Sequence, residues 1–492
     1  MNSDLEKYFS PFRENIIGYN QTFKSPFGEQ KIIYTDWTAS GRLYRPIEQK
    51  LLNSFGPYVA NTHTETSFTG ATMTKAYHKA RNIIKQHVNA NKNDVLITEG
   101  SGMTGVINKF QRILGLRIPE SLKKYATIPQ ELKPIVFITH MEHHSNQTSW
   151  EETIADVEII PCQETGLVCF KSFRKLLDKY KDRPIKIASV TACSNVTGIQ
   201  TDYHKIANII HKAGGVCFVD FACSAPYVNI NMHPKKDENG FLDAIFFSPH
   251  KFLGGPGSSG VLLFNKKLYH NLVPDNPGGG TVSYTNPWGE HIYLDDIELR
   301  EDGGTPGFLQ AIRTALAIQL KEKMGVEKIL EREHELNKYI FGQLEDIKNL
   351  HLLAGQHHNR LGIFSFYVDD VHFNLIVKLL NDKFGIQTRG GCSCAGTYGH
   401  FLLHLDQNKS HNFMEQIEEG CLVERPGWIR MSIHPTITNK EIAYVCNSIK
   451  KVVENYKDWG KDYTYDASTN EFVYTKQDNA AKDLMANWFD LD

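Results

Sequence analysis

The sequence lacks the features that mark membrane proteins and nucleic-acid-binding proteins. None of its apolar runs is long enough to cross a bilayer, and its first residues are polar and charged, without the apolar core of a secretory signal. Its 54 basic and 56 acidic residues nearly balance, which leaves no electrostatic case for nucleic acid or an anionic membrane as the main partner. We therefore expect a globular protein of the cytoplasm.

The nine cysteines do not indicate a disulfide framework, because their number is odd and no secretory signal precedes them. Cys217 lies in an apolar run and is expected to fill the core. Cys392 and Cys394 differ, since a glycine-rich polar loop surrounds them. With His400 and His404 they could be counted as four zinc ligands, but Cys-x-Cys is not the usual spacing of a structural zinc site. We predict reduced thiols and no metal.

The chain of 492 residues is too long for one simple core. From about residue 94, short apolar runs alternate with stretches of helical periodicity, which is typical of a largely parallel α/β sheet. Most of the runs are continuously apolar, as in strands that are covered on both faces. The expected strands are 95–98, 135–139, 157–160, 185–190, 216–219, 244–247 and 261–264.

We expect two domains with an extension at either end. These are an N-terminal segment (1–35), a large domain (36–310), a small α/β domain (311–459) and a tail (460–492). Residues 307–347 are expected to form one long or broken helix, punctuated at Gly325. Residues 397–426 show no clear periodicity and are expected to form a long loop. In the small domain we expect strands at 363–367 and 428–432 and helices at 373–384 and 440–456.

Lys251 is the most informative residue of the chain. It follows the apolar run 243–247 and precedes a glycine-rich turn, in the sequence Ser-Pro-His-Lys-Phe-Leu-Gly-Gly-Pro-Gly. A strand end places a side chain at the rim of a sheet, where α/β proteins bind ligands. A lysine held there, away from bulk water, can keep the neutral amine that Schiff-base chemistry needs. Taken alone, Lys251 would more simply be a surface lysine beside a turn.

Pyridoxal phosphate requires a lysine, a carboxylate at its ring nitrogen, an anion site and a surface for its ring. Asp220 follows the strand 216–219 and can pair with the ring nitrogen, although a turn or helix-cap aspartate is about as good an interpretation. Residues 99–104 (Glu-Gly-Ser-Gly-Met-Thr) open a helix, whose free N–H groups suit a phosphate. Ser248 and His250 could add donors beside Lys251.

Two further polar residues follow expected strands. His143 could stack on the pyridine ring; the pair His143–His144 could instead suggest a metal, but no partner at ligand spacing stands beside it. Asn195 could donate to the phenolic oxygen of the cofactor, or be an ordinary turn asparagine before Gly198.

Six motifs stand in the order seen in class V aminotransferase-fold enzymes, and the chain most resembles cysteine desulfurases and selenocysteine lyases over residues 36–456. They are Met-Glu-His-His-Ser-Asn (141–146), Ser-Asn-Val-Thr-Gly (194–198), Val-Asp (219–220), Ser-Pro-His-Lys (248–251), Gly-Gly-Gly (278–280) and Gly-Thr-Pro (304–306). The resemblance implies a pyridoxal phosphate enzyme of fold type I, the aspartate-aminotransferase-like fold, with a large, mostly parallel-sheet domain and a small C-terminal α/β domain. It also implies a homodimer with shared active sites.

The resemblance implies a role for each candidate. Lys251 would form the Schiff base, Asp220 would pair with the ring nitrogen, and His143 would stack on the ring. Asn195 would contact the phenolic oxygen and lie near the substrate. The phosphate would be held by Gly102, Met103, Thr104, Ser248 and His250, and Thr281 would reach the phosphate of the neighbouring subunit. The chain departs from the family at Cys223, where a glutamine usually touches the phenolic oxygen and a thiol is only a weak donor.

The segment 388–400 (Thr-Arg-Gly-Gly-Cys-Ser-Cys-Ala-Gly-Thr-Tyr-Gly-His) is similar to the catalytic cysteine loop of desulfurases and to that of molybdenum cofactor sulfurases. Counted from Arg389, Cys394 stands at the position of the nucleophile, although Cys392 could share or replace its role. Arg430 matches the arginine that binds the substrate carboxylate, where a planar guanidinium suits bidentate pairing. Without the motif it would be an arginine on a half-exposed strand.

These expectations lead to one function and two alternatives. The first is a cysteine desulfurase that converts L-cysteine to L-alanine, leaves a persulfide on Cys394 and passes sulfur to an acceptor protein. The second is another enzyme of the same fold, an aminotransferase, epimerase or selenocysteine lyase, which Cys223 favours. The third is a non-catalytic scaffold or sulfur-carrier partner, which the position of Lys251 disfavours.

Overall fold

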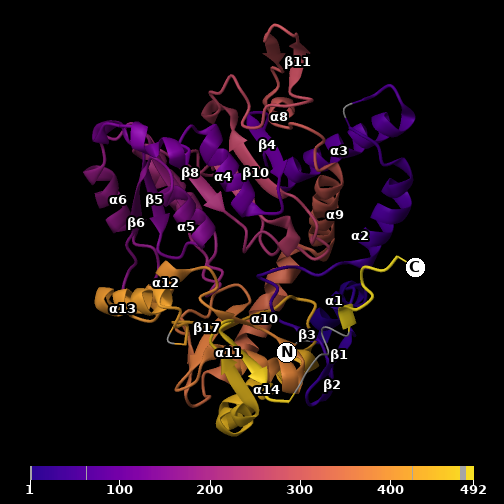
Figure 1. The fold of residues 1–492 in the computed structure, drawn as a ribbon, viewed down its shortest axis with the longest axis vertical. Helices are drawn as coiled ribbons and strands as arrows, with labels where there is room; N and C mark the ends of the chain where they lie inside the picture. The colour runs from indigo at the N-terminus through magenta and orange to yellow at the C-terminus, as the bar shows by residue number, and fades with distance from the viewer. Residues whose placement is uncertain (1–2, 63, 424, 477–483, 492) are drawn as a thin grey trace. The chain divides into compact units, whose positions relative to one another are not determined.

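The computed structural model describes residues 3–62, 64–423, 425–476 and 484–491. The chain divides into two compact units, and it passes from one to the other more than once. The central unit comprises Ser40–Ser194 and Gln200–Val326. The terminal unit comprises Met1–Ala39, Asn195–Ile199 and Glu327–Asp492. Figure 1 follows the chain through both.

A seven-stranded sheet forms the middle of the central unit, in the order β4-β10-β9-β8-β7-β5-β6. Of these strands, β10 alone runs antiparallel to its neighbours, β9 and β4. All seven expected strands are present, so the predicted mostly parallel sheet is confirmed. The strands are β4 (Asp94–Glu99), β5 (Ile135–Thr139), β6 (Asp156–Ile160), β7 (Lys186–Thr191), β8 (Val216–Asp220), β9 (Ala244–Phe247) and β10 (Gly260–Asn265).

The sheet is covered by helices, as its continuously apolar strands require. Phe110 and Trp150, from two of these helices, pack with Phe218 of β8 in the core, and all three side chains are fully buried. Helices α4 and α5 pack against the strands (Figure 1). The helices are α2 (Arg45–Lys50), α3 (Phe68–His87), α4 (Met103–Ile113), α5 (His144–Glu151), α6 (Phe170–Lys179), α7 (Tyr203–Lys212), α8 (Ile297–Arg300) and α9 (Phe308–Met324). A hairpin of β11 (Val282–Thr285) and β12 (His291–Tyr293) projects from this unit (Figure 1).

The terminal unit contains a four-stranded sheet in the order β13-β14-β17-β16 and three two-stranded pairings. Strand β3 pairs in parallel with β15, so that Ile33 lies opposite Ile386. The strands are β1 (Thr22–Ser25), β2 (Gly28–Lys31), β3 (Ile33–Tyr34), β13 (Leu350–Leu352), β14 (Ile363–Val368), β15 (Ile386–Gln387), β16 (Arg389–Gly391), β17 (Trp428–Ser432), β18 (Tyr463–Asp466) and β19 (Glu471–Tyr474). The helices are α1 (Ser3–Glu14), α10 (Val326–Leu344), α11 (Phe373–Phe384), α12 (Gly396–Leu402), α13 (Gln407–Glu418) and α14 (Asn439–Trp459).

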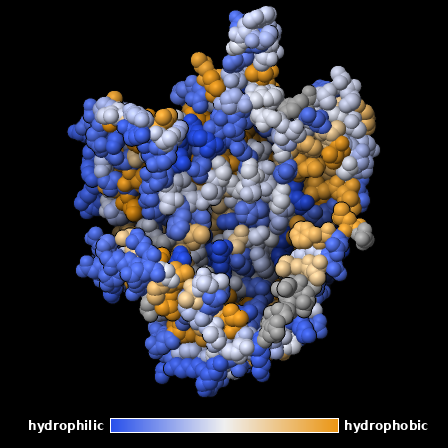
Figure 2. Space-filling model, viewed as in Figure 1, coloured by the Kyte–Doolittle hydropathy of each residue, from blue (hydrophilic) through white to orange (hydrophobic). Residues whose placement is uncertain are grey.

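The helix expected over residues 307–347 is broken, because Gly325 ends α9 with a positive φ of 76°. The expectation of a loop over residues 397–426 is wrong, since most of this segment forms α12 and α13. Helix α13 has no buried residue, because its short apolar stripe of Phe413, Met414 and Ile417 is half-buried or exposed and does not pack into a core, and the surface of the helix is largely hydrophilic in Figure 2. Its start is set instead by Asp406, whose side chain accepts from the Lys409 N–H.

None of the helices in the described part of the chain combines the length and apolar character needed to cross a membrane.

Candidate active site

Lys251 lies in a short 3₁₀ turn, Pro249–Lys251, immediately after β9. The glycine-rich turn that follows is sterically required. A Cβ atom on Gly255 would stand 1.8 Å from the Pro249 carbonyl oxygen, and one on Gly41 would stand 2.0 Å from the Phe252 carbonyl oxygen. Strand, turn and glycines together fix the backbone of Lys251 at the strand end, as the sequence predicted.

Asp220 is the last residue of β8, which pairs in parallel with β9. Its carboxylate is buried, and its Oδ1 accepts a hydrogen bond of 2.8 Å from the Ala222 N–H. Burial raises the pKa of Asp220 to about 6, while the Ala222 N–H and the positive charge of Lys251 lower it. A buried carboxylate in this setting is suited to a cationic N–H partner, which the nitrogen of a pyridinium ring provides.

The residues expected around a phosphate lie together. Gly102 precedes α4; the Met103 N–H donates to Ser248 Oγ at 2.9 Å. A Cβ atom on Gly102 would lie 3.0 Å from His250 Cε1 and 3.1 Å from Ser248 Oγ, so these three residues form one close-packed cradle. Thr104 Oγ1 lies 2.7 Å from Ser145 Oγ on the neighbouring helix. The N-terminal N–H groups of α4 open beside these side chains, an arrangement that suits an anion.

The hydrogen bonds of His250, which forms part of this cradle, define the tautomer of its neutral ring. Its Nδ1 lies 2.8 Å from the Ser101 carbonyl oxygen, which can only accept, so Nδ1 carries a proton. Burial and the charge of Lys251 lower the pKa of His250. The Nε2 atom therefore accepts when the ring is neutral and donates only to a group, such as a phosphate, whose negative charge favours the imidazolium.

His143 caps the N-terminus of α5, and its Nδ1 accepts from the Ser145 N–H at 3.1 Å. This bond leaves the proton of the neutral ring on Nε2. The residue before it, Glu142, was not singled out from the sequence, and its side chain is almost completely buried. The signal available in the sequence was an acidic residue three positions after the end of the buried strand β5.

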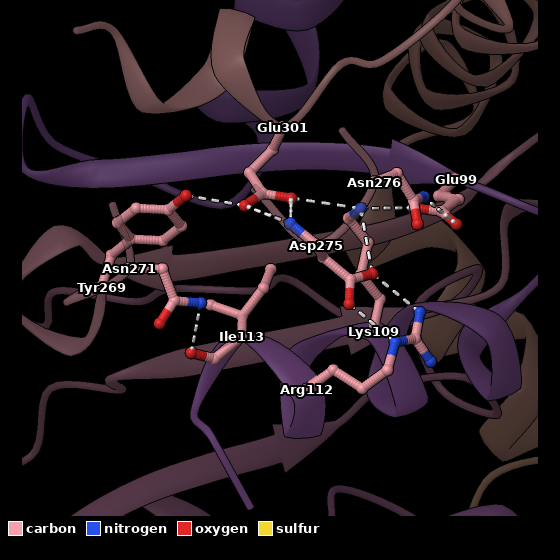
Figure 3. Close-up of polar contacts among 9 residues, drawn as sticks. All are labelled: Glu99, Lys109, Arg112, Ile113, Tyr269, Asn271, Asp275, Asn276 and Glu301. Atoms are coloured by element: carbon pink, nitrogen blue, oxygen red, sulfur yellow. Dashed lines mark hydrogen bonds and ion pairs between the residues drawn. The ribbon is translucent and has the colours of Figure 1, made fainter. Parts of the chain in front are cut away.

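Cys223 and Thr281 are both buried, and each has a local hydrogen bond. The Cys223 thiol contacts the Ser194 carbonyl oxygen at 3.7 Å. The Thr281 hydroxyl donates to the Gly278 carbonyl oxygen at 2.6 Å. The chain just before Thr281 is held by Asp275, which pairs with Arg112 at 2.7 Å and with the fully buried Lys109 at 3.4 Å (Figure 3).

The terminal unit carries the remaining candidates. Arg430, on β17, is buried and pairs through Nη2 with Asp36 Oδ1 at 2.7 Å. Its Nη1 donates to the Asn195 carbonyl oxygen at 3.4 Å, and the Asn195 Nδ2 donates to the Ser393 carbonyl oxygen at 2.7 Å. Arg430 Nε and Asn195 Oδ1 are buried without a hydrogen-bond partner among the described residues. Such orphaned atoms are uncommon in folded proteins, and here a donor and an acceptor await a polar ligand.

Cys394 lies in a tight turn directly after β16. The turn is closed by the Ala395 N–H, which donates to the Cys392 carbonyl oxygen at 3.0 Å, and its central residues Ser393 and Cys394 have positive φ values of 52° and 56°. Ser393 anchors the turn, because its hydroxyl also accepts from Trp428 Nε1 at 3.2 Å. Ser393 was not among the residues predicted from the sequence. Both cysteines are half-buried, and Arg425 Nη2 donates to Cys392 Sγ at 3.6 Å.

All nine cysteines are described, and all are free thiols. Within the described residues, no three His, Cys, Asp or Glu side chains form a group that could hold a metal ion.

The chain belongs to the class V aminotransferase family, whose model matches residues 33–445. It is therefore a pyridoxal phosphate-dependent enzyme, and the lysine, the carboxylate and the anion cradle of the central unit fit that cofactor. This confirms the fold type, the enzyme class and the cofactor expected from the sequence motifs.

Two relatives of this chain carry the same name. It is 28% identical to a probable cysteine desulfurase of Halalkalibacterium halodurans over 372 residues, which cover 74% of this chain and 84% of the relative. It is 26% identical to a probable cysteine desulfurase of Staphylococcus aureus over 393 residues, 78% of this chain and 89% of the relative.

Solved structures show the same fold. A cysteine desulfurase of Thermococcus onnurineus superposes with a TM-score of 0.71 and 21% identity, over 90% of this chain and 98% of the other. One of Escherichia coli gives 0.65 and 21%, over 86% and 94%.

Proposed function

We propose that this protein is a cysteine desulfurase, which converts L-cysteine to L-alanine and retains the sulfur on Cys394. The observation that carries the proposal is the Cys394 turn. Its thiol sits on a left-handed residue in a turn held through Ser393, so the backbone is anchored while the thiol itself is half-exposed. An anchored backbone with an available thiol is what a nucleophile needs. The names of the relatives support the same activity.

Arg430 binds the carboxylate of the amino acid in this proposal. Its guanidinium is oriented by Asp36 and by the Asn195 carbonyl oxygen, and its unpartnered Nε donates to the substrate. Asn195 is fixed through its Nδ2, which leaves Oδ1 as the acceptor for a donor of the substrate or of the cofactor. A short, polar amino acid suits these two atoms.

The bound cofactor would supply an electron sink for the α-carbon of the amino acid. Lys251 removes the α-proton as a neutral amine and returns it as a general acid. Asp220 holds the proton of the ring nitrogen, and His143, with its proton on Nε2, relays protons beside the ring. The Cys394 thiolate attacks the sulfur of the substrate. The carbon–sulfur bond breaks, a sulfur–sulfur bond forms on Cys394, and the carbon takes up a proton to give alanine.

In this proposal the enzyme also needs a sulfur acceptor, a second subunit and a reducing compartment. The persulfide passes from Cys394 to a thiol of an acceptor protein. The protein works as a homodimer in which Thr281 completes the phosphate site of the neighbouring subunit. It operates in the reducing cytoplasm, with which nine free thiols are compatible.

The test is the release of alanine and sulfide from L-cysteine, in the presence of a reductant, by the purified protein loaded with cofactor. Wild type should release both in equal amounts. Cys394→Ala should lose both while keeping the bound cofactor, and Lys251→Ala should lose both and its Schiff-base absorbance. Cys421→Ala, which removes an exposed thiol, is the matched control and should behave as wild type. Full turnover by Cys394→Ala would refute the proposal.

A selenocysteine lyase or another amino-acid enzyme of the family is the second candidate. The observation that favours it is Cys223, a buried thiol directed at the Ser194 carbonyl oxygen. A thiol is a weaker donor than the family's glutamine amide, so the phenolic oxygen of the cofactor would be stabilised less. The same assay with selenocysteine and with other amino acids distinguishes the two, since loaded protein that turns over only these and ignores cysteine would establish the second candidate.

A further inference from the structure

Glu142 connects three elements of the cofactor site in the central unit. Its Oε1 accepts hydrogen bonds from the Thr139 hydroxyl at 2.6 Å, the Thr139 N–H at 3.2 Å and the Thr191 N–H at 2.8 Å. Its Oε2 accepts from Asn146 Nδ2 at 2.7 Å. These donors lie at the end of β5, at the end of β7 and in the first turn of α5. Since His143 is the next residue along the chain, the Glu142 side chain fixes the backbone that presents the His143 ring.

The partners of Glu142 are themselves fixed, so the network has little freedom to rearrange. Asn146 Oδ1 accepts from the Ser189 hydroxyl at 2.6 Å and from Trp150 Nε1 at 3.1 Å. The Thr139 hydroxyl accepts from the Met141 N–H at 3.2 Å. All of these side chains are buried. A buried carboxylate that receives four hydrogen bonds is costly to replace, because every partner would lose its acceptor.

Glu142 also places a second carboxyl group near Asp220. Thr191, which donates to Glu142, lies directly opposite Asp220 in the pairing of β7 with β8. Burial raises the pKa of Glu142 to about 8; its hydrogen bonds lower it, and the negative charge of Asp220 raises it. The Thr139 hydroxyl can also rotate and accept a hydrogen bond from the protonated carboxylic acid, so the network accommodates both protonation states.

We propose that Glu142 is a positioning residue of the cofactor site, which fixes the backbone beside His143 and thereby orients the His143 ring. The proposal rests on the cofactor of the family and not on the desulfurase reaction. It predicts that the position of the ring depends on the length of the Glu142 side chain and on its two acceptor atoms.

The test follows the visible circular dichroism of the cofactor in the holoenzyme without substrate. In Glu142→Gln an amide nitrogen would face the Asn146 Nδ2 donor, so this hydrogen bond is lost and the dichroism should weaken because the ring loses its fixed contact. Glu142→Asp shortens the side chain and should weaken the dichroism as well. Glu151→Gln, which changes an exposed carboxylate at the end of α5, is the control and should keep the dichroism of wild type.

The outcomes decide the proposal whatever happens to the reaction. A folded Glu142→Gln protein with the dichroism of wild type overturns it. If that variant does not fold, Thr139→Val removes one donor to Glu142 and leaves the rest, and it must also weaken the dichroism; an unchanged dichroism overturns the proposal. A loss of desulfurase activity in wild type would leave these spectra, and thus this inference, untouched.

Discussion

Lys321, in the last turn of α9, is a lysine buried in the core of the central unit. Only 1% of its surface is exposed. Its Nζ donates to the Val228 carbonyl oxygen and lies 3.2 Å from His87 Nε2 and 5.7 Å from the centroid of the Phe252 ring. Burial lowers its pKa from 10.5 to about 7, and the charge of the neighbouring Glu322 offsets only part of that effect. Burial lowers the pKa of His87 as well, so its neutral ring adds no positive charge beside Lys321.

The sign of the consequence follows from proton linkage. Between pH 7 and pH 10.5 the unfolded chain carries a proton on Lys321 that the folded chain gives up, so the free energy of unfolding rises with pH over this window. Lys321 destabilises the folded state most below pH 7, and this destabilisation disappears as the lysine becomes neutral in both the folded and the unfolded state. Each pKa unit corresponds to about 1.36 kcal/mol, so the gain from pH 7 to pH 9 is about 2 kcal/mol.

The measurement compares urea unfolding of wild type and Lys321→Met at pH 7 and pH 9. Wild type should gain about 2 kcal/mol more than the variant on going from pH 7 to pH 9. The loss of the donor to the Val228 carbonyl oxygen does not depend on pH over this range and cancels from the comparison. Lys323→Met, an exposed lysine on the same helix, should keep the wild-type pH dependence. If Lys321→Met has the same pH dependence as wild type, the reasoning is refuted.

Two further outcomes are expected, each checked by one measurement. Lys109→Met leaves three carboxylates without the buried cation they share (Figure 3), so unfolding should cost about 3–5 kcal/mol less and the melting temperature should fall by roughly 10 °C; an unchanged melting temperature contradicts this. Gly102→Ala places a methyl group 3.0 Å from His250 and 3.1 Å from Ser248, so the cofactor should dissociate about tenfold faster, measured by the loss of its absorbance on dilution. In the control, Gly105→Ala, the nearest atom to the new methyl group would be the Gly100 Cα at 4.0 Å, so the rate should not change.

The central sheet could be predicted from the sequence because its strands are buried on both faces. All positions of β5 are buried, and all of its residues except Thr139 are apolar, so the run can be recognised without tertiary information. Helix α13 shows the opposite case. None of its residues is fully buried, and its apolar residues, Phe413, Met414 and Ile417, span only about one turn, so the hydrophobic periodicity there is too short to indicate a helix. The hairpin of β18 and β19 was not predicted for a related reason, since all of its residues except Tyr463 are exposed or half-buried.

The candidate site divides in the same way. Lys251 and Asp220 lie at the ends of strands, and because ligands of α/β proteins bind at strand ends, both could be predicted as site residues from the sequence. Asp36 could not be found, because its partner Arg430 lies 394 positions away and only the folded chain brings them together. Glu142 and Ser393 act through contacts of the same long-range kind, with Thr191 and with Trp428.

The parallel pairing of β3 with β15 bears on how the chain folds while it is being made. Ile33 leaves the ribosome more than 350 residues before Ile386, its partner. Apart from the local pairing of β1 with β2, residues 3–39 and 195–199 therefore lack their native partners until the last third of the chain emerges, whereas the central unit ends at Val326 and can collapse earlier. Until then the apolar side chains of α1, among them Phe9 and Phe12, lack their native packing, and transiently exposed apolar surface of this kind is what chaperones bind.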